Sequence, residues 1–558
     1  MSSKIELDKI KPLDVWAIID TYFRDNPDYK SRHHIDSFNE LISSKTNGIE
    51  YIIKRENPQL IYKEEENGKY RYHLSIYYGE TLDEKGEVKE VDKNLFISSP
   101  IEYDNDKSSY MYPNIARLKK YTYASSILCN IGVILTDTKT NKSRVRNFEK
   151  VNIGTMPIMV KSNLCILNGL DDVRLTELGE CPYDKGGYFI INGKEKIFLS
   201  QEKKINNILY INSQSDEKSP LQGTIKTLST KGFQSSRTNN ISLNRVRLEY
   251  GPSNKELAEN SSRHVYRITV RIKGIVSEVG NDFKIPLFVL FRALGVTSDK
   301  QIIEKILYDD DSPVLKREMM ELLDPSIRDG QMVYTQKDAY KLLLLYTKQK
   351  ETINVIEILK NNFFPNYHTE NEKAFYLGYT VRNLLLTRCK VYEETDRDSY
   401  AYKRVDLAGS MLLELYRELW AIFVKNVSLK IDYEYKWHFK LHNNDITNIV
   451  NDDNQKKIFN SRHMDNIVKS FGSIFGTKES GRQGIIQDLN RNVMLGTLSH
   501  TRRLSYPLAG DSKSLGPRKL HNSQWGFVCP TESPDGGNVG IINHLSIVAL
   551  VSFSVSDV

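Results

Sequence analysis

The positive charge of the chain gathers near its C-terminal end, between residues 481 and 525. Seven basic residues stand there against two acidic ones, a net charge of +5. The basic residues are Arg482, Arg491, Arg502, Arg503, Lys513, Arg518 and Lys519, and the acidic ones are Asp488 and Asp511. Planar guanidinium groups match phosphate oxygens better than a lysine point charge does. This composition favours a nucleic-acid-binding surface, and a solvated basic face is the open alternative.

Neutral hydrogen-bonding side chains are interleaved with these charges. They are Gln487, Asn490, Asn492, Ser499, His500 and Ser505. Such a mixture can hold phosphate and sugar groups without reading bases. Glycines and prolines recur in the same stretch, for example at Gly510 and at Gly516-Pro517, and loops of this kind often carry function on a rigid scaffold.

Two carboxylates lie close together in Cys529-Pro-Thr-Glu-Ser-Pro-Asp-Gly-Gly537. Glu532 and Asp535 could serve as an acid/base pair, could cap the local turn, or could pair with the nearby arginines. The sequence shows no hydrolase-like His/Ser or His/Cys arrangement, no phosphate-binding loop and no cluster of metal-binding carboxylates. We therefore expect a binding scaffold with no catalytic residue and no metal ligand of its own.

The elements that must position these residues can be read from the hydrophobic pattern. A length of 558 residues predicts about three or four domains. The first ~60 residues look helical, and residues 69–160 look mostly like strands. Asn192-Gly193 between two apolar runs predicts a hairpin with a type I′ turn. The polar stretch 215–240 reads as an exposed loop region.

A helical block follows between Pro286 and about residue 390, so that 206–390 reads as a mixed α/β domain. Pro286 near a helix start and Gly295 just past its end show the usual asymmetry. After Asp406, an amphipathic run repeats Leu412, Leu415, Leu419 and Ile422 every three or four residues. A heptad seam or a cofactor box would look similar, but packing against the first domain is the better interpretation. The expected fold class is mixed α/β (α+β) and multidomain.

Net charge, cysteine content and the length of apolar segments limit the classes of protein to which the chain can belong. The chain has 78 basic and 71 acidic residues, a mild excess of +7 that fits a nucleic-acid partner without demanding one. None of its five cysteines forms a C-x-x-C pair, so reduced structural thiols are expected and a zinc ribbon is not. The N-terminus lacks the apolar core of a signal peptide, and the longest apolar candidate, 541–555, is interrupted by polar residues. We expect a soluble intracellular protein with no membrane partner.

The stretch SHTRRLSYPLAGDSKSLGPRKLHNSQWGFVCPTESPDGGNVGIINHLSIVAL closely resembles the fork region of the second-largest (beta-type) subunit of multisubunit DNA-directed RNA polymerases. The resemblance continues backwards in collinear order. DRDSYAYKRVDLAG, ECPYDKGGYFIINGKEKIFLSQE, IGTMPIMVKSNLC, MYPNIARLKKYTYAS and HHIDSFNE each resemble a landmark of that family. Only about 206–390 has diverged.

The resemblance implies an architecture. Residues 1–205 and 391–458 would form the protrusion, 206–390 the lobe, and 459–558 the fork region. In the family the fork lies beside the active centre and contacts the RNA–DNA hybrid and the template. The loop from Ala509 to Gly516 would be the fork loop near the point of strand separation.

The resemblance also implies roles for individual residues. The positions expected near nucleic acid are Arg482, Gln487, Arg502, Arg503, Lys513 and Arg518. Gln487, Asn490, His500 and Ser505 match the rifamycin-pocket region of bacterial relatives, from which drug sensitivity does not follow. The family has a glutamate where this chain has Asp535; the position tunes substrate-binding basic residues, or shapes the turn together with Glu532.

In the family, the catalytic magnesium is held by the largest subunit, and the second subunit continues for several hundred more residues. The resemblance therefore implies an enzyme only as part of a complex, with nucleotidyltransferase activity that this chain lacks in isolation. The implied partners are the largest subunit, the C-terminal half of the second subunit, the other polymerase subunits, template DNA and RNA. A split or truncated subunit is expected, and a stand-alone nucleic-acid-binding relative is the alternative.

The motifs and the Lys/Asn/Tyr-rich composition look most like the versions of this subunit in large nucleocytoplasmic DNA viruses. A virus would place the protein in the host cytoplasm or viral factory and in the virion. No targeting signal is seen.

Overall fold

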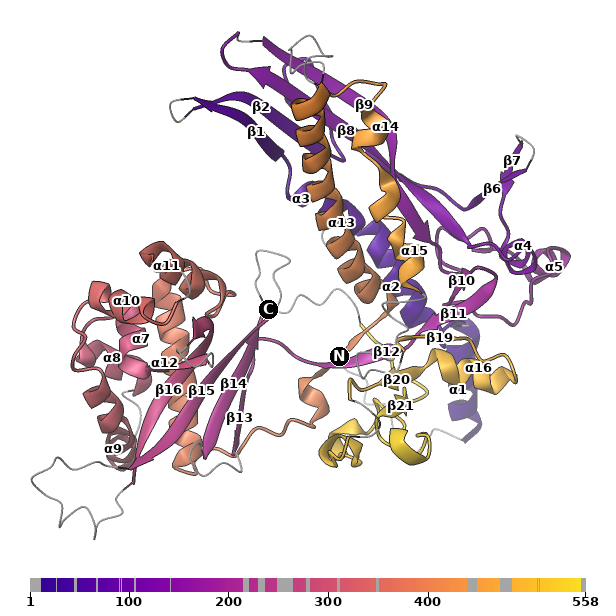
Figure 1. The fold of residues 1–558 in the computed structure, drawn as a ribbon. Helices are drawn as coiled ribbons and strands as arrows, with labels where there is room; N and C mark the ends of the chain where they lie inside the picture. Colours follow the sequence, from indigo (N-terminus) through magenta and orange to yellow (C-terminus); the bar gives the residue numbers. More distant parts are fainter. Residues whose placement is uncertain are drawn as a thin grey trace, which may run out of the picture. The chain divides into compact units, whose positions relative to one another are not determined.

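The computed structural model describes residues 12–552, apart from 27, 45–47, 67–68, 90, 92, 105–106, 141, 214–219, 229–235, 248–263, 277–281, 309–311, 348–350, 439–448, 472–483, 509 and 511. The chain divides into two compact units (Figure 1). The first unit combines residues up to 203 with those from 403 onward, and the inserted unit comprises residues 204–402. Each is described below by itself.

The first unit begins with the helices that the sequence predicts. They are α1 (Pro12–Asp25), α2 (Arg32–Ser43) and α3 (Ile49–Arg55). Helix α2 buries His33, His34, Phe38 and Leu41 on one face, whereas α1 buries none of its residues.

A five-stranded antiparallel sheet follows, in agreement with the strands expected between residues 69 and 160. Its order is β1-β2-β8-β5, with β9 also paired to β8. The bounds are β1 (Gln59–Glu66), β2 (Lys69–Tyr78), β5 (Leu95–Ile97), β8 (Ala124–Asp137) and β9 (Lys142–Pro157). Two small hairpins, β3 (Thr81–Leu82) with β4 (Val88–Lys89) and β6 (Ile101–Asp104) with β7 (Lys107–Tyr110), and two short helices, α4 (Pro113–Leu118) and α5 (Asp172–Glu177), complete this part.

Helix α13 (Ala408–Tyr433) is the predicted amphipathic helix, and it packs against α2 and α3 as expected (Figure 1). Leu412, Leu415 and Leu419 are buried, and Trp420 meets Tyr78 of β2 edge to face at 5.1 Å. Ile422 corrects the prediction, because it lies at the edge of the buried stripe and is 44% exposed. The chain then continues through a π-helical turn (Glu434–His438), α14 (Gln455–Ile458), a 3₁₀ turn (Ser461–His463) and α15 (Asn466–Ser470).

The inserted unit is a sheet covered by helices. The antiparallel strands follow in chain order: β13 (Leu209–Ser213), β14 (Leu221–Thr227), β15 (Arg237–Arg247), β16 (His264–Val276) and β17 (Asp282–Pro286). The helices are α7 (Leu287–Ala293), α8 (Asp299–Ile306), α9 (Pro313–Asp329), α10 (Gln336–Leu344), α11 (Thr352–Asn361) and α12 (Glu370–Arg388). Their apolar side chains form one core with the inward face of the sheet.

The prediction of a loop at 215–240 is wrong in part. Residues 221–227 form β14, and β15 begins at Arg237; the remaining loop positions lie largely outside the described residues. In β14 the buried side chains of Leu221 and Ile225 alternate with Gln222, Thr224 and Lys226, so a polar strand was mistaken for a loop. The helix after Pro286 and the positive φ of Gly295 agree with the prediction.

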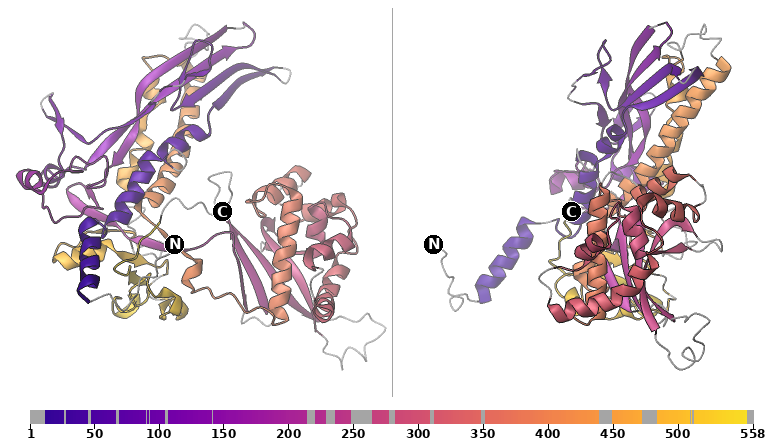
Figure 2. Two further views of the ribbon diagram at one scale, coloured as in Figure 1. Left: turned by 180° about the vertical axis from the view of Figure 1, so that it is seen from behind. Right: turned by 90° about the vertical axis from the view of Figure 1, so that its left-hand side faces the viewer.

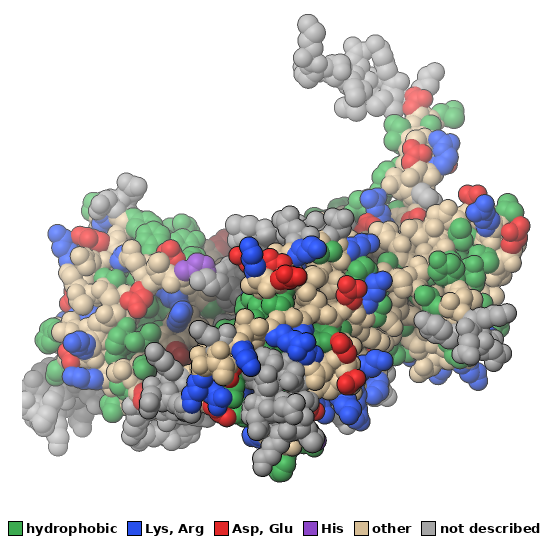
Figure 3. Space-filling model, turned by 90° about the horizontal axis from the view of Figure 1, so that it is seen from above, with side chains coloured by type: hydrophobic (Ala, Val, Ile, Leu, Met, Phe, Trp, Pro, Cys, Tyr) green, Lys and Arg blue, Asp and Glu red, His purple; other side chains and the backbone are tan. Residues whose placement is uncertain are grey.

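Charges are mixed on the face seen in Figure 3, where basic side chains lie close to acidic ones.

All five cysteines are free thiols, as expected. Within the described part of the chain, no helix is long and apolar enough to cross a bilayer.

Candidate nucleic-acid interface

The basic C-terminal segment is fixed to the first unit by β-sheet pairing. Strand β19 (Ile486–Asp488) pairs with β11 (Lys194–Phe198), which forms the predicted hairpin with β10 (Phe189–Ile191). Asn192 and Gly193 have φ values of 50° and 76°, as a type I′ turn requires. Because β19 is the third strand of this sheet, the hairpin sets the position of Gln487.

A network of ion pairs reinforces this attachment. Arg491 donates to Glu195 at 2.6 Å and to Asp184 at 2.8 Å. Arg117 donates to the same Glu195 at 2.8 Å and to both carboxylate oxygens of Glu180. Burial would raise the pKa of Asp184, but Arg491 and local hydrogen bonds outweigh it and leave that pKa below its ordinary value. Arg491 therefore anchors the segment, and its charge is largely neutralised.

A second sheet carries Arg503. It has the order β18-β12-β20-β21, with β12 (Ser200–Lys204), β18 (Lys403–Asp406), β20 (Arg503–Ser505) and β21 (Ile542–His544). Arg503 faces His544 across β20 and β21, and its Nε donates to His544 Nε2 at 3.4 Å. The Arg503 side chain is half-buried, and no described residue accepts from its terminal nitrogens.

His544 links this sheet to the loop that holds the two carboxylates. Its Nδ1 lies 3.1 Å from the Glu532 carbonyl oxygen, and the Glu532 carboxylate accepts from the Ser499 hydroxyl at 2.6 Å. Burial lowers the pKa of His544, so a neutral ring can donate from Nδ1 and accept from Arg503 at Nε2. Glu532 thus ties the turn to α16 (Met494–Thr501). Asp535 is exposed and has no hydrogen-bond or ion-pair partner among the described residues.

His500, Gln487 and Asn490 meet in one hydrogen-bonded cluster. The Asn490 backbone N–H donates to His500 Nδ1 at 3.1 Å, and His500 Nε2 lies 3.0 Å from Gln487 Oε1. Burial, with Arg503 and His544 nearby, lowers the pKa of His500 to about 4. The neutral ring therefore donates from Nε2 to Gln487. Ser505 is buried in β20 and takes no part in this cluster.

Arg502 lies in the interior and not on the predicted surface. Its side chain is 8% exposed and donates to carbonyl oxygens of Ser546, Ile547 and Ala549 and, at 3.4 Å, to that of Tyr29. The guanidinium thereby joins the end of the described chain to the turn before α2.

Arg518 is also occupied by the chain itself. One terminal nitrogen donates to Gly537 at 2.6 Å and Val539 at 3.0 Å, and the other to Gly510 at 2.8 Å and Ser512 at 3.1 Å. All four acceptors are backbone carbonyls. Arg518 therefore holds Gly510 and Ser512 against the turn that follows Asp535.

The remaining predicted cations are the lysines. Lys513 and Lys519 are exposed, with no hydrogen-bond or ion-pair partner among the described residues. Arg482 lies outside the described residues. The structure thus brings Gln487, Asn490, His500 and Arg503 close together, and it gives Arg491, Arg502 and Arg518 backbone or carboxylate partners.

Sequence reasoning missed several residues that build this region. The rings of His33 and His34 are tilted by 40° with their centroids 4.2 Å apart, and both Nε2 atoms lie against the Thr501 carbonyl oxygen, at 3.2 and 2.9 Å. Arg117, Glu195 and His544 were missed as well. Their contacts join positions up to several hundred residues apart, and no local pattern signals them.

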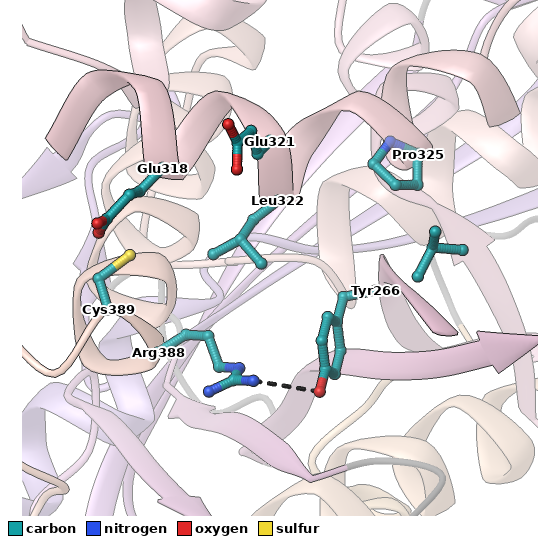
Figure 4. A pocket seen from close by; sticks show the side chains of 8 residues that line it. Tyr266, Glu318, Glu321, Leu322, Pro325, Arg388 and Cys389 are labelled. Atoms are coloured by element: carbon teal, nitrogen blue, oxygen red, sulfur yellow. Dashed lines mark hydrogen bonds between the residues drawn. The ribbon is translucent and has the colours of Figure 1, made fainter. Parts of the chain in front are cut away.

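A separate pocket lies in the inserted unit (Figure 4). It has a volume of about 390 Å³, and its walls are Val265, Tyr266, Glu318, Glu321, Leu322, Pro325, Arg388 and Cys389. Arg388 donates to the Tyr266 hydroxyl at 3.1 Å and lies over its ring. None of its lining residues is among the predicted site residues.

Residues 30–451 match a family model described as RNA polymerase beta subunit, and residues 487–551 match one described as RNA polymerase Rpb2, domain 3. The chain belongs to the RNA polymerase beta-subunit family. The first match covers more than half of the sequence, including the inserted unit that looked diverged. The mixed helix-and-sheet, multidomain fold class expected for this family is confirmed.

Individual relatives agree with the family match. The chain is 30% identical to RNA polymerase II subunit 2 of Arabidopsis thaliana over 98% of its length, and 29% identical to RPB2 of Encephalitozoon cuniculi over 97%. It spans 44% of the length of each of these relatives. It is also 28% identical to the polymerase subunit Rpo2N of Methanothermobacter thermautotrophicus, where the alignment covers 96% of this chain and 94% of that protein.

Proposed function

We propose that the chain forms the N-terminal part of the second-largest subunit of a DNA-directed RNA polymerase. The observation that carries the proposal is its collinear similarity to eukaryotic and archaeal polymerase subunits over nearly its whole length. It would work in template-directed nucleotidyl transfer as part of an assembly. Its partners would be the largest subunit, the C-terminal half of the second subunit, the other subunits, and DNA and RNA.

Within this proposal the parts keep the names that the resemblance implies. Residues 1–205 and 391–458 would be the protrusion, 206–390 the lobe and 459–558 the fork. The magnesium would be held by the largest subunit. Among the described residues of this chain, no three His, Cys, Asp or Glu side chains lie close enough together to hold a metal ion. The role that we propose for this chain is to bind and position nucleic acid.

Arg503 and Lys513 are the contacts we propose for the nucleic-acid backbone, because both present cationic donors that no described residue satisfies. Arg502 and Arg518 would act indirectly, by holding the segment in shape. Gln487 would be positioned by His500. Asp535 remains the candidate for electrostatic tuning of neighbouring basic groups, since its carboxylate has no partner in the described residues.

The test is Arg503→Ala in the assembled polymerase. Losing one charge-assisted hydrogen bond removes about 1.5 to 3 kcal/mol, so the lifetime of a stalled elongation complex should fall by about tenfold or more. Arg144→Ala is the matched control, because Arg144 is an exposed arginine on β9. An unchanged lifetime in Arg503→Ala would remove that residue from the interface.

The assembly itself is tested by affinity capture of the tagged chain from its native source. Co-purification of a largest subunit and of the C-terminal half of the second subunit would support the proposal. A stand-alone binding protein would come through as a monomer without polymerase subunits. We further propose that the chain comes from a large nucleocytoplasmic DNA virus, in which the complex would lie in the host cytoplasm or viral factory and in the virion.

A further inference from the structure

A pocket in the inserted unit lies between its sheet and two of the helices that cover the sheet (Figure 4). The helices of this unit lie on one side of the strands: α12 is behind them in Figure 1 and in front of them in the left view of Figure 2. The pocket is lined from β16, from α9 and from the end of α12. Its apolar part consists of Val265, Leu322 and Pro325. A volume of about 390 Å³ is within the roughly 300 to 1,000 Å³ typical of ligand sites.

The walls of this pocket are fixed by contacts between α9 and β16. The Ile268 backbone N–H donates to the Ser326 hydroxyl oxygen at 2.9 Å, one residue beyond Pro325. Arg267 Nε lies 3.3 Å from a carboxylate oxygen of Asp329, which joins the same two elements again. Both Ile268 and Ser326 are buried. The pocket is therefore formed without a ligand, and a preformed site lowers the ordering cost of binding.

Hydrogen-bond acceptors belong to the α9 side of the pocket. Glu318 is exposed and forms no hydrogen bond or ion pair with any described residue. Glu321 pairs with Arg317 of its own helix at 3.4 Å, and both side chains are exposed, so this pair contributes little. Pro325 lies inside α9, and because proline has no N–H, the Glu321 carbonyl oxygen loses its helical donor. Two carboxylates and one carbonyl on this stretch of helix can thus accept from a ligand.

A guanidinium and a thiol lie at the end of α12. Arg388 donates to the Tyr266 hydroxyl at 3.1 Å and lies over the Tyr266 ring, 4.9 Å from its centroid. No described carboxylate pairs with Arg388, so its remaining N–H donors are available to a ligand. The Cys389 thiol lies beside Glu318 (Figure 4), and burial, together with that carboxylate, raises the pKa of Cys389. The pocket therefore has an acidic side, a cationic side and an apolar part between them.

We infer that this pocket binds a lysine side chain of a partner protein. An ammonium group has three donors and no acceptor, which matches two carboxylates and a carbonyl. The methylene stem of the lysine would pack on Val265 and Leu322, as such stems do on apolar surface. Peptide carbonyl oxygens next to that lysine would accept from Arg388. All of these groups lie in the inserted unit, so lysine binding does not rest on the proposed function.

Two other kinds of cation match the pocket less well. An arginine side chain gains from stacking on an aromatic ring, but Arg388 already lies over the ring of Tyr266. A polyamine carries several positive charges and no acceptor, so Arg388 would repel it. A polypeptide instead offers carbonyl oxygens to Arg388 and an ammonium to the glutamates. The distribution of charge in the pocket thus favours lysine within a polypeptide.

The test uses the full-length chain and Nα-acetyl-lysine N-methylamide, which mimics a lysine within a polypeptide. Cys389 is the reporter, because a ligand in the pocket should shield its thiol from N-ethylmaleimide. Peptide mass spectrometry follows its alkylation, with Cys181, an exposed thiol of the first unit, as the internal control. We expect the saturating probe to slow alkylation of Cys389 at least threefold and to leave the rate at Cys181 unchanged. Unprotected Cys389 at every probe concentration would overturn the inference.

Variants of the acidic side show whether the carboxylates bind the probe. Glu318→Gln/Glu321→Gln keeps the shape of the pocket, removes its negative charge, and should raise the half-protecting concentration at least threefold. Its alkylation rate without probe should equal that of the parent chain, which establishes that the variant is folded. Glu304→Gln/Glu357→Gln removes two exposed charges from α8 and α11 and is the matched control that should behave like the parent. Equal protection in the pocket variant and the parent would overturn the inference.

The chemistry of the ligand is tested with related probes. The Nε-acetyl form of the probe carries no charge and should not protect Cys389. Stronger protection by spermidine than by the lysine probe would assign the pocket to a free polyamine and overturn the inference. In the complex captured from the native source, a zero-length carbodiimide crosslink from Glu318 or Glu321 should join a lysine of another polypeptide. Crosslinks to lysines of this chain alone would contradict a partner protein in the pocket.

Discussion

At the scale of single residues, arginines of the same segment have different roles according to their partners. Arg518 donates to four backbone carbonyls, whereas Arg503 keeps terminal nitrogens without a described acceptor. A composition count treats them alike. The sequence could predict that the segment is basic, but the acceptors that occupy Arg491, Arg502 and Arg518 come from the fold.

Arg518 gives a direct test of this distinction. Arg518→Lys keeps the charge but cannot reach four carbonyls, because an ammonium lacks the planar fork. We expect Arg518→Lys and Arg518→Ala to destabilise the local structure alike, by about 1 to 3 kcal/mol. Hydrogen exchange at Gly540 and Ile541, whose amides donate to Ser533 and Asn538, would measure it. Full protection in Arg518→Lys would instead indicate that only the charge matters.

His34 gives a pH dependence at the same scale. Burial lowers the pKa of His34 to about 4; the Thr501 carbonyl opposes this shift and Arg502 adds to it. Burial, with His34 and Arg502 nearby, also holds the pKa of His33 well below its usual range. The unfolded chain takes up protons near pH 6.5, so protonation favours unfolding between pH 6.5 and about 4. Stability should fall there by about 1.4 kcal/mol per pH unit per histidine.

Urea unfolding at pH 7, 6 and 5 would measure this loss. His34→Asn removes one titrating group and should flatten the dependence, while His368→Gln in the inserted unit should leave the first unit's dependence unchanged. An identical slope in His34→Asn and the parent chain would show that this ring does not contribute.

At the scale of elements, local patterns predicted the structure best where burial is one-sided. Both helix α13 and the hairpin at Asn192-Gly193 have a local sequence pattern that predicts them. Strand β14 did not, since its outward residues are as polar as a loop and its inward ones are few. The attachment of β19 to β11 was equally hidden, because no local signal links residues 194–198 to 486–488.

That hairpin supports a prediction about the element next to it. A Cβ at position 193 would lie 2.8 Å from the Lys120 Cα, and an alanine there would have to adopt a φ of +76°. Gly193→Ala should therefore cost about 1 to 3 kcal/mol and loosen β19 along with β11. Limited proteolysis near residues 484–490 would reveal it. Asn192→Gly, which suits the same turn, is the control, and equal protection of both variants would show that β19 does not depend on the turn.

At the scale of the whole molecule, the inserted unit enters and leaves the first unit through neighbouring strands. Strands β12 and β18 are hydrogen-bonded neighbours, and Lys203 contacts Asp406 at 2.6 Å. The Ile205 amide donates to the Tyr402 carbonyl at 2.9 Å. The two connections therefore lie about one strand spacing, roughly 5 Å, apart. The inserted unit also has a hydrophobic core of its own.

This arrangement predicts that the units fold independently. Replacing residues 205–402 with a short Gly-Ser linker should leave the first unit folded, because a two- or three-residue turn spans neighbouring strands. Residues 204–402 expressed separately should unfold in one cooperative transition, since their sheet and helices share a single core. Calorimetry of both pieces, compared with the whole chain, provides the measurement. If the linker variant loses its transition, the first unit needs the inserted one, and the separation into cores would not correspond to a separation in stability.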